Sequence, residues 1–504
     1  MRAMERIATD TYSFERIREG GFVYVDKTAI MKTLADGSIG TQFFIARPSR
    51  FGKSLAISTF QCLFEGRREL FKGLAIEPEW DWSKTYPVLK LDMGSCQAAS
   101  VNDLWKKINT MLKAESERVG VPLRADEPAS GKFRFLMSDM IAAADRAAKA
   151  KNPQARIDKV VLLVDEYDKP LLGHLGKDDV NEIHDALKEF YSVIKTCEGM
   201  QRFAFITGVS KFSKVSIFSD LNNLNEFSMD ERVATLFGYT HEEVKANFPE
   251  SLKALGEKFG LDVEATFAKL VYWYDGYRFH QDAQPVFNPV SVGKCLSSRQ
   301  FDPYWFETGT PAFLLKLMRE NPVTMDDVEI PQTAFSVYEP AKPGLMSILY
   351  QTGYLTIKSA HDDGGIRLYR LVAPNFEVET AFSQALSVEF ANIDELEHAS
   401  LLTQMVEALR HDDVNDMLDA LSCFFSNIPA NITVKREKYY QTLFYAVFVL
   451  IGTASAALAQ IKEKGYHEKY LRDGRKVTLA GVAFDAEMRN LSDRQIEVAA
   501  DAVR

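Results

Sequence analysis

Apolar residues in the first half of the chain come in short runs, separated by longer segments with helical spacing. Buried strands are predicted at 42–46, 87–93, 160–164 and 202–208, and helices from about residue 53 and over 101–119, 133–150 and 181–196. The run VVLLV at 160–164 is apolar throughout, as expected of a strand that is covered on both faces of a parallel sheet. This alternation predicts an α/β fold in which a parallel sheet has helices on both faces.

The pattern changes after about residue 235, where helices predominate. Thr240, followed by Glu242 and Glu243, indicates a helix start, and helices are predicted over 240–248, 252–259, 264–274, 394–409, 414–425, 437–451 and 454–471. A helix ending near Gly353 precedes a strand that can pair with 367–372 as a hairpin, and a lone strand is predicted at 476–484. We interpret the aromatic stretches 273–279 and 304–306 as core rather than as a base-stacking platform.

Composition narrows the class of protein. The 504 residues predict two to four domains, and 46% hydrophobic with 26% charged residues is typical of a soluble globular chain. A net charge of −10 argues against nucleic-acid binding by the whole surface and leaves room for a local basic groove. The five scattered cysteines form no CxxC pair, which indicates reduced thiols. The longest apolar run near the C-terminus, 444–452, is about half a membrane span, so we expect a cytoplasmic protein with no membrane partner.

The segment 47–54, RPSRFGKS, follows a predicted strand and opens a predicted helix, where a phosphate-binding loop belongs. In such a loop backbone N–H groups meet the phosphates, Lys53 reaches the β/γ oxygens and the Ser54 hydroxyl ligates Mg²⁺. Arg50, Phe51 and Gly52 complete the candidate ATP-binding loop, although Arg47 stands where the general pattern has glycine. On the G-K-S triplet alone, a helix start with a solvated lysine is an equal alternative.

Acidic residues downstream strengthen this interpretation. VVLLV runs directly into Asp165 and Glu166, so that Asp165 can hold the Mg²⁺ water shell and Glu166 can orient an attacking water. Thr207, at the end of the fourth strand, is a candidate sensor of the γ-phosphate; a hydroxyl bound to backbone is the alternative. We therefore name Glu166, Lys53 and Thr207 as catalytic candidates, and Ser54 and Asp165 as metal candidates.

Further polar residues near the predicted site are ambiguous. Lys211 and Lys214 follow the fourth strand and either neutralise phosphate charge or remain solvated. Arg50 either contacts phosphate or stays in solvent. Asp26 and Lys27 either lie near the base or ribose or form a structural ion pair.

Long motifs carry a family resemblance: VYVDKT at 23–28, ARPSRFGKS at 46–54, LLVDEYDKP at 162–170 and TGVSKFSKVSIFSDLNNL at 207–224. With WFETGTP, QTGYLTI and QIKEKGY later in the chain, they resemble the bacterial AAA-ATPase-like proteins. The resemblance implies ATP binding with hydrolysis, an extra strand between the loop strand and the acidic strand, and a C-terminal nuclease-like domain of the PD-(D/E)xK superfamily. Arg47 is usual in this family. The implied domains are a P-loop ATPase domain at 1–235, a helical or winged-helix-like lid or effector at 236–430, and a nuclease-like remnant at 431–504.

The C-terminal remnant lacks the residues that cleavage needs. No acid-x-Lys triplet occurs between 445 and 504, although such a nuclease uses it to hold Mg²⁺ and its nucleophile. We therefore expect no nuclease activity. The leading hypothesis is a Mg²⁺-dependent ATPase acting as a molecular switch on an unidentified protein partner, with an oligomer allowed. The alternatives are a non-hydrolysing ATP-gated interaction module and a nucleic-acid-associated protein.

Overall fold

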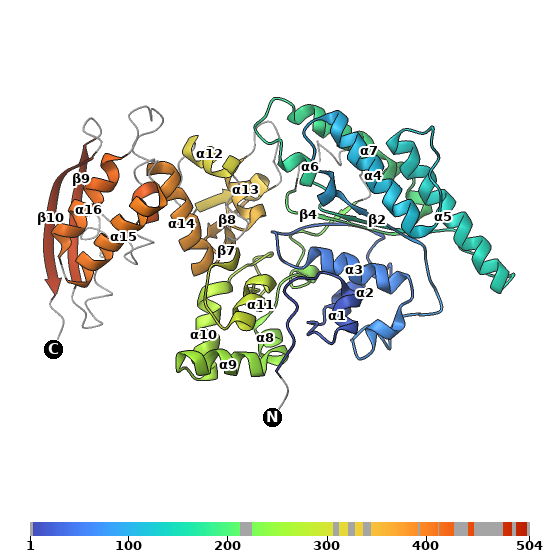
Figure 1. Cartoon of the computed structure of the whole chain (residues 1–504), viewed down its shortest axis with the longest axis horizontal. Coiled ribbons are helices and arrows are strands. Elements are labelled where there is room, and N and C mark those ends of the chain that lie inside the picture. The colour runs from blue at the N-terminus through green and yellow to red at the C-terminus, as the bar shows by residue number, and fades with distance from the viewer. Residues whose placement is uncertain are drawn as a thin grey trace. The chain divides into compact units, whose positions relative to one another are not determined.

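The structure is a computed structural model that describes residues 4–211, 224–305, 312–320, 328–335, 344–391, 394–411, 413–427, 442–447, 477–485 and 490–500. The chain divides into two units, which are described separately below (Figure 1). The first comprises Met1–Glu307 and Asp326–Glu377, and the second comprises Thr308–Met325 and Val378–Arg504.

A parallel sheet of five strands organises the first unit. Its strands are β1 (Gln42–Ala46), β2 (Val88–Asp92), β3 (Val160–Asp165), β4 (Gln201–Gly208) and β5 (Asn225–Glu226), in the order β2-β3-β4-β1-β5. Strand β4 therefore separates β1, which leads into the candidate phosphate loop, from β3, which carries the acidic pair. This order confirms the predicted α/β class and the extra strand that the family resemblance implied.

Helices cover both faces of this sheet (Figure 1). One side carries α1 (Phe14–Glu19), α2 (Thr28–Ala35) and α3 (Lys53–Phe64), and the other carries α4 (Val101–Val119), α5 (Ala129–Lys151) and α7 (Val180–Thr196); the short α6 (Lys169–Leu172) follows β3. The Ser100 side chain caps the start of α4, and Gly120 ends it in the left-handed conformation. Between them Leu104, Ile108 and Leu112 repeat every fourth residue and are buried, so one stripe of α4 faces the core.

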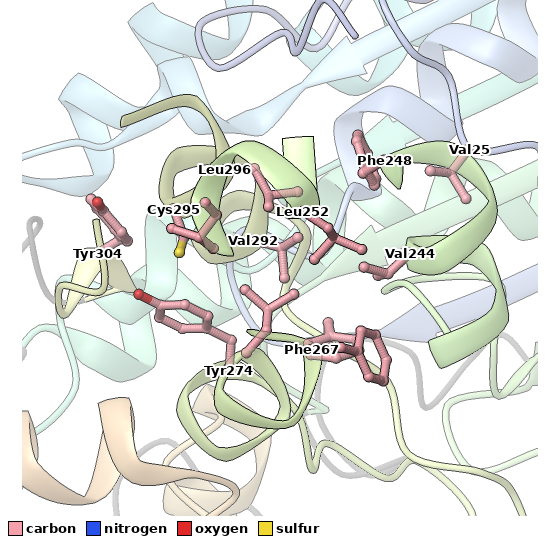
Figure 2. Close-up of a cluster of buried hydrophobic side chains, with 13 residues drawn as sticks. Val25, Val244, Phe248, Leu252, Phe267, Tyr274, Val292, Cys295, Leu296 and Tyr304 are labelled. Atoms are coloured by element: carbon pink, nitrogen blue, oxygen red, sulfur yellow. The ribbon is translucent and has the colours of Figure 1, made fainter. Parts of the chain in front are cut away.

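Four helices form a second core in the same unit: α8 (His241–Asn247), α9 (Pro249–Phe259), α10 (Val263–Tyr274) and α11 (Pro289–Ser298). Thr240 and Glu243 form a capping box at the start of α8, which confirms the predicted helix start. Figure 2 shows side chains from these helices converging, among them Phe248, Leu252 and Phe267, together with Val25 from the N-terminal segment. Fully burying one such apolar side chain contributes about 1.5–3 kcal/mol, so this cluster ties the N-terminal segment to the helices.

A small antiparallel sheet completes the first unit. Its strands β6 (Val328–Pro331), β7 (Thr356–Asp363) and β8 (Ile366–Val372) are ordered β6-β8-β7, and α13 (Leu345–Thr352) precedes β7. The hairpin predicted across the HDDGG turn is confirmed by the antiparallel pairing of β7 with β8. Gly353 ends α13 at a φ of 90°, as the sequence predicted.

The second unit contains α12 (Ala312–Glu320), most of α14 (Phe376–Ala391), α15 (Glu395–Arg410), α16 (Val414–Ser426) and the strands β9 (Val477–Asp485) and β10 (Asn490–Ala500). The strand predicted at 476–484 is present as β9, but the prediction that it stands alone is wrong, because β9 pairs with β10 in an antiparallel hairpin. Of the predicted helix 437–451 only 442–447 is described, and it is helical. The predicted helix 454–471 lies outside the described residues. Among those that are described, no helix is long and apolar enough to span a membrane.

Candidate nucleotide site

The loop between β1 and α3 has an unusual backbone. Arg50 has a φ of 69°, and Gly52, at the N-cap of α3, has a φ of 93°. A side chain at position 52 would be strained in this left-handed conformation, so glycine suits the tight entry into the helix. In the described part of the chain, positive φ occurs at three non-glycine residues, Arg50, Glu166 and Arg299. Two of them belong to this site, and such outliers gather at functional sites.

Lys53 folds back over the loop instead of extending into solvent. Its side chain is buried, and its Nζ donates to the carbonyl oxygens of Arg47 (3.0 Å) and Pro48 (2.9 Å). Burial lowers the pKa of Lys53, while the nearby carboxylates of Asp165, Glu166 and Asp168 oppose this shift. The loop therefore holds the Lys53 amino group at its centre, where an anionic ligand can bind to it.

Asp165 and Ser54, the two metal candidates, lie together. Asp165 ends β3, Ser54 is the second residue of α3, and both residues line the same cleft. Burial raises the pKa of Asp165, and the nearby Ser54 hydroxyl and the charge of Lys53 oppose that rise. Mg²⁺ prefers oxygen ligands and usually takes one or two carboxylates together with phosphates and waters. A carboxylate beside a hydroxyl fits that requirement, although no cluster of three or more His, Cys, Asp or Glu that could hold a metal ion occurs among the described residues, here or elsewhere.

Glu166 lies on the rim of an open cleft of about 620 Å³, together with Ser54, Asp92 and Asp165. Its φ of 48° turns the chain after β3. The side chain reaches towards Gly94, where an added Cβ would lie only 2.7 Å from its Oε2 atom. Asp92 ends β2 in register with Asp165, so a third acid lines this edge of the sheet. The sequence contained a signal for Asp92, since it lies near the end of the strand predicted at 87–93, but its proximity to Asp165 depends on the strand order.

Thr207, which we predicted as a sensor of the γ-phosphate, is not among the residues that line the cleft. Its side chain is fully buried, and its Oγ1 donates to the carbonyl oxygen of Ile45 at 2.8 Å. The alternative of a hydroxyl satisfied by backbone is the observed arrangement. Lys211 forms an ion pair with Glu226 at 2.5 Å. Lys214 lies outside the described residues.

The arginines and the phenylalanine of the loop point away from its centre. Arg47 is buried, donates to the carbonyl oxygen of Ser228 at 2.6 Å and lies 4.1 Å from the Phe279 ring, and burial lowers its pKa to about 10. Arg50 donates to the carbonyl oxygen of Tyr304. The Phe51 ring packs edge-on against Tyr277 (4.7 Å) and Phe279. Phe51 can therefore contact a phosphate only through its backbone N–H group. The burial of Tyr277, Phe279 and Tyr304 agrees with the interpretation of these aromatic stretches as core.

A second, smaller cavity of about 100 Å³ adjoins the loop. It is lined by loop and α3 residues, by the N-terminal segment and by the start of the helical region, including Tyr24, Val25, Lys27, Gly52, Leu55 and Tyr239. The Lys27 ammonium pairs with Glu243 at 2.6 Å and donates to the carbonyl oxygen of Thr235. Asp26 is a structural residue, because its carboxylate accepts from Thr28 and from the N–H of Ala75.

Asp168 is a buried acid to which sequence reasoning gave no role. Its carboxylate accepts from the N–H groups of Val209 and Ser210, which follow β4. Burial raises its pKa, and these backbone bonds oppose the rise. Asp168 therefore fixes the turn after β4 to the segment after β3.

Comparison with known proteins agrees with this geometry. Residues 8–218 match the family model described as "Predicted AAA-ATPase". The chain is also 34% identical over 527 residues to the "Uncharacterized protein in vnfD 5'region" of Azotobacter chroococcum mcd 1, with 95% of this chain and 96% of that protein covered. Because the aligned region is longer than the 504 residues of this chain, the relative contains inserted residues that this chain lacks.

Proposed function

This chain belongs to the family of predicted AAA-ATPases, and on that premise we propose that it binds ATP with Mg²⁺ at the 47–54 loop and hydrolyses the nucleotide. The observation that carries the proposal is the convergence of Lys53, Ser54, Asp165 and Glu166 from two separate segments at one edge of the parallel sheet. Ligands of open α/β sheets bind at this carboxyl edge.

Each residue has a distinct role in the proposal. Backbone N–H groups at the start of α3 and the Lys53 ammonium hold the phosphates. Ser54 and Asp165 hold Mg²⁺, which supplies charge neutralisation to the leaving phosphate. Glu166, on the cleft rim, orients a water molecule towards the γ-phosphate. Its side chain is 34% exposed, so water reaches it without rearrangement of the core.

The small cavity that adjoins the loop is the proposed base site. It adjoins Gly52 and Leu55 and mixes aromatic, aliphatic and polar groups, which suits a flat heterocycle. Its volume of about 100 Å³ requires the surrounding side chains to separate when a base enters. Because both the N-terminal segment and the helical region line it, an occupied base site would link these parts, as a molecular switch requires.

A second candidate function is an ATP-gated interaction module without turnover. It is favoured by the end of β4, where the Thr207 hydroxyl and the Lys211 ammonium are both engaged within the protein. Neither offers a polar group to a γ-phosphate in this conformation. Nucleotide would then bind and reposition the helical region without being cleaved.

Substitution of Glu166→Gln separates the two candidates. For an ATPase we expect the variant to bind ATP as the wild type does and to release phosphate about 10²-fold more slowly. Glu15→Gln is the matched control, since Glu15 lines the same cleft and forms only an exposed ion pair with Arg67. Wild-type binding without phosphate release would instead establish the gated module.

A further inference from the structure

Three residues after β4, Val209–Lys211, form a short segment that we term the post-β4 turn. Its first two N–H groups donate to the carboxylate of Asp168, at 3.2 Å from Val209 and 2.6 Å from Ser210. The Tyr167 hydroxyl donates to the carbonyl oxygen of Ser210 at 2.9 Å. Asp168 is 1% exposed, so solvent does not compete for these bonds. The sheet side of the turn is therefore held by the segment that carries the acidic pair.

The third residue of the turn is held from another element. The N–H of Lys211 donates to Oε1 of Gln351 at 2.9 Å, and Gln351 lies in the last turn of α13. The Gln351 amide nitrogen donates to Ser347 Oγ at 3.0 Å and to the carbonyl oxygen of Phe335 at 3.4 Å. Gln351 is buried, so losing a partner would leave a polar group unsatisfied. One side chain thus joins the post-β4 turn to α13 and to the segment that follows β6.

The end of α13 also contacts the phosphate loop directly. Gly353 has a φ of 90°, and a Cβ added there would lie 2.8 Å from Cβ of Pro48. Any larger residue would therefore push α13 away from the loop. The carbonyl oxygen of Pro48 accepts from Lys53 Nζ at 2.9 Å. The same helix end therefore touches the loop that holds Lys53 and the turn that follows β4.

Phosphate binding would act on both contacts. An anion at the loop competes with the carbonyl oxygens of Arg47 and Pro48 for the Lys53 ammonium. Asp168 lies close enough to Lys53 for its charge to favour the protonated lysine. A phosphate bound to Lys53 would therefore also change the electrostatic interaction between Lys53 and Asp168. Pro48 contacts Gly353 at the end of α13. Asp168 binds the post-β4 turn, and the turn donates to Gln351 of α13.

We propose that the post-β4 turn, clamped between Asp168 and Gln351, transmits the nucleotide state of the loop to α13 and to the sheet of β6, β7 and β8. Gln351 is a positioning residue in this scheme, because it touches neither nucleotide nor metal. The scheme rests on the proposed function, since it needs nucleotide at the loop. It identifies α13 as the element whose stability changes when ATP binds.

Hydrogen exchange of α13 amides in the full-length protein, with and without Mg²⁺ and a non-hydrolysable ATP analogue, tests the scheme. In the wild type we expect the analogue to slow exchange in α13 at least about fivefold. In Gln351→Met this slowing disappears. Because coupling between two sites is reciprocal, its loss can lower the affinity for the analogue by no more than about fivefold. Thr352→Val is the control, because the Thr352 hydroxyl bonds within α13 and leaves the turn alone.

Ser347→Ala is a milder second variant, which removes only the support of the Gln351 amide. It guards against misfolding of Gln351→Met, and we expect it to reduce the protection partially. Persistence of full nucleotide-dependent protection in both variants would overturn the scheme. Analogue binding by the wild type without protection of α13 would overturn the scheme alone. Absence of binding would overturn the proposed function and the scheme with it.

Discussion

Ser54, at the start of α3, and Asp165, at the end of β3, line one cleft at the carboxyl edge of the parallel sheet. Their meeting brings the phosphate loop and the acidic strand together, although β4 lies between β1 and β3. It also places two oxygen ligands side by side at the carboxyl edge of the sheet, beside the Lys53 ammonium.

The first prediction concerns Asp165→Asn. Burial raises the pKa of Asp165, which means that the protein disfavours its charged form. We therefore expect the asparagine variant to be as stable as the wild type or more stable, while its Mg²⁺-dependent phosphate release falls at least about 10²-fold. Thermal unfolding and phosphate release with and without Mg²⁺ measure the two effects. A stable variant with normal Mg²⁺-dependent release would remove Asp165 from the metal site.

Thr207→Val tests whether Thr207 senses the γ-phosphate. The hydroxyl donates to the carbonyl oxygen of Ile45 inside the sheet, so its loss should cost about 1–2 kcal/mol of stability. Phosphate release per folded molecule should stay within about threefold of the wild type, because a group that senses phosphate would cost far more. A loss of release on the order of 10²-fold, at unchanged ATP binding, would restore Thr207 as a sensor.

How much of this site could be predicted from sequence depends on the kind of inference. The strand at 42–46 and the helix at 101–119 were predicted with their observed bounds, because clear polar or glycine boundaries flank each pattern. Lys53, Ser54, Asp165 and Glu166 were predicted to meet, because strand ends of a parallel sheet share one edge. The direction of the Thr207 side chain was not predictable, since a shift of one residue along a strand reverses the face.

Other features needed tertiary information. Asp92 adjoins the site only because β2 is the neighbour of β3, and strand order is not encoded in local pattern. Asp168 binds a turn 41 residues away. Strand β10 was missed because Asp493 and Arg494 interrupt its apolar alternation, and pairing with β9 stabilises it nonetheless.

The pairing of Lys27 with Glu243 joins the N-terminal segment to α8, and both side chains are largely buried. Lys27→Met leaves the Glu243 carboxylate without its cation, so we expect a loss of about 3 kcal/mol. The double variant Lys27→Met, Glu243→Gln should regain part of that loss, because no uncompensated charge remains. Unfolding of the four members of this cycle measures the coupling. Additive losses would show that the pair contributes nothing beyond its separate residues.

Glu377 gives the protein a pH dependence. Burial raises the pKa of this carboxyl to about 7, against the opposing hydrogen bonds from the Trp305 N–H and the Ser291 hydroxyl. An acid whose folded pKa is raised contributes stability that is complete below its ordinary pKa of 4.5 and is lost as the pH rises through 7. The wild type should therefore lose on the order of 3 kcal/mol relative to Glu377→Gln between pH 4.5 and pH 8. Thermal unfolding of the two proteins across this pH range measures the difference in stability. A difference that does not change with pH would contradict the raised pKa of Glu377.

The most direct test of the nucleotide site is ATP binding and phosphate release by the purified wild type and by Lys53→Ala, with Mg²⁺ present. Lys53 is the charge at the centre of the loop, so we expect the wild type to bind ATP and release phosphate, and the variant to lose both while remaining folded. If the wild type does not bind ATP, or if the folded variant binds it equally well, the 47–54 loop is not a nucleotide site.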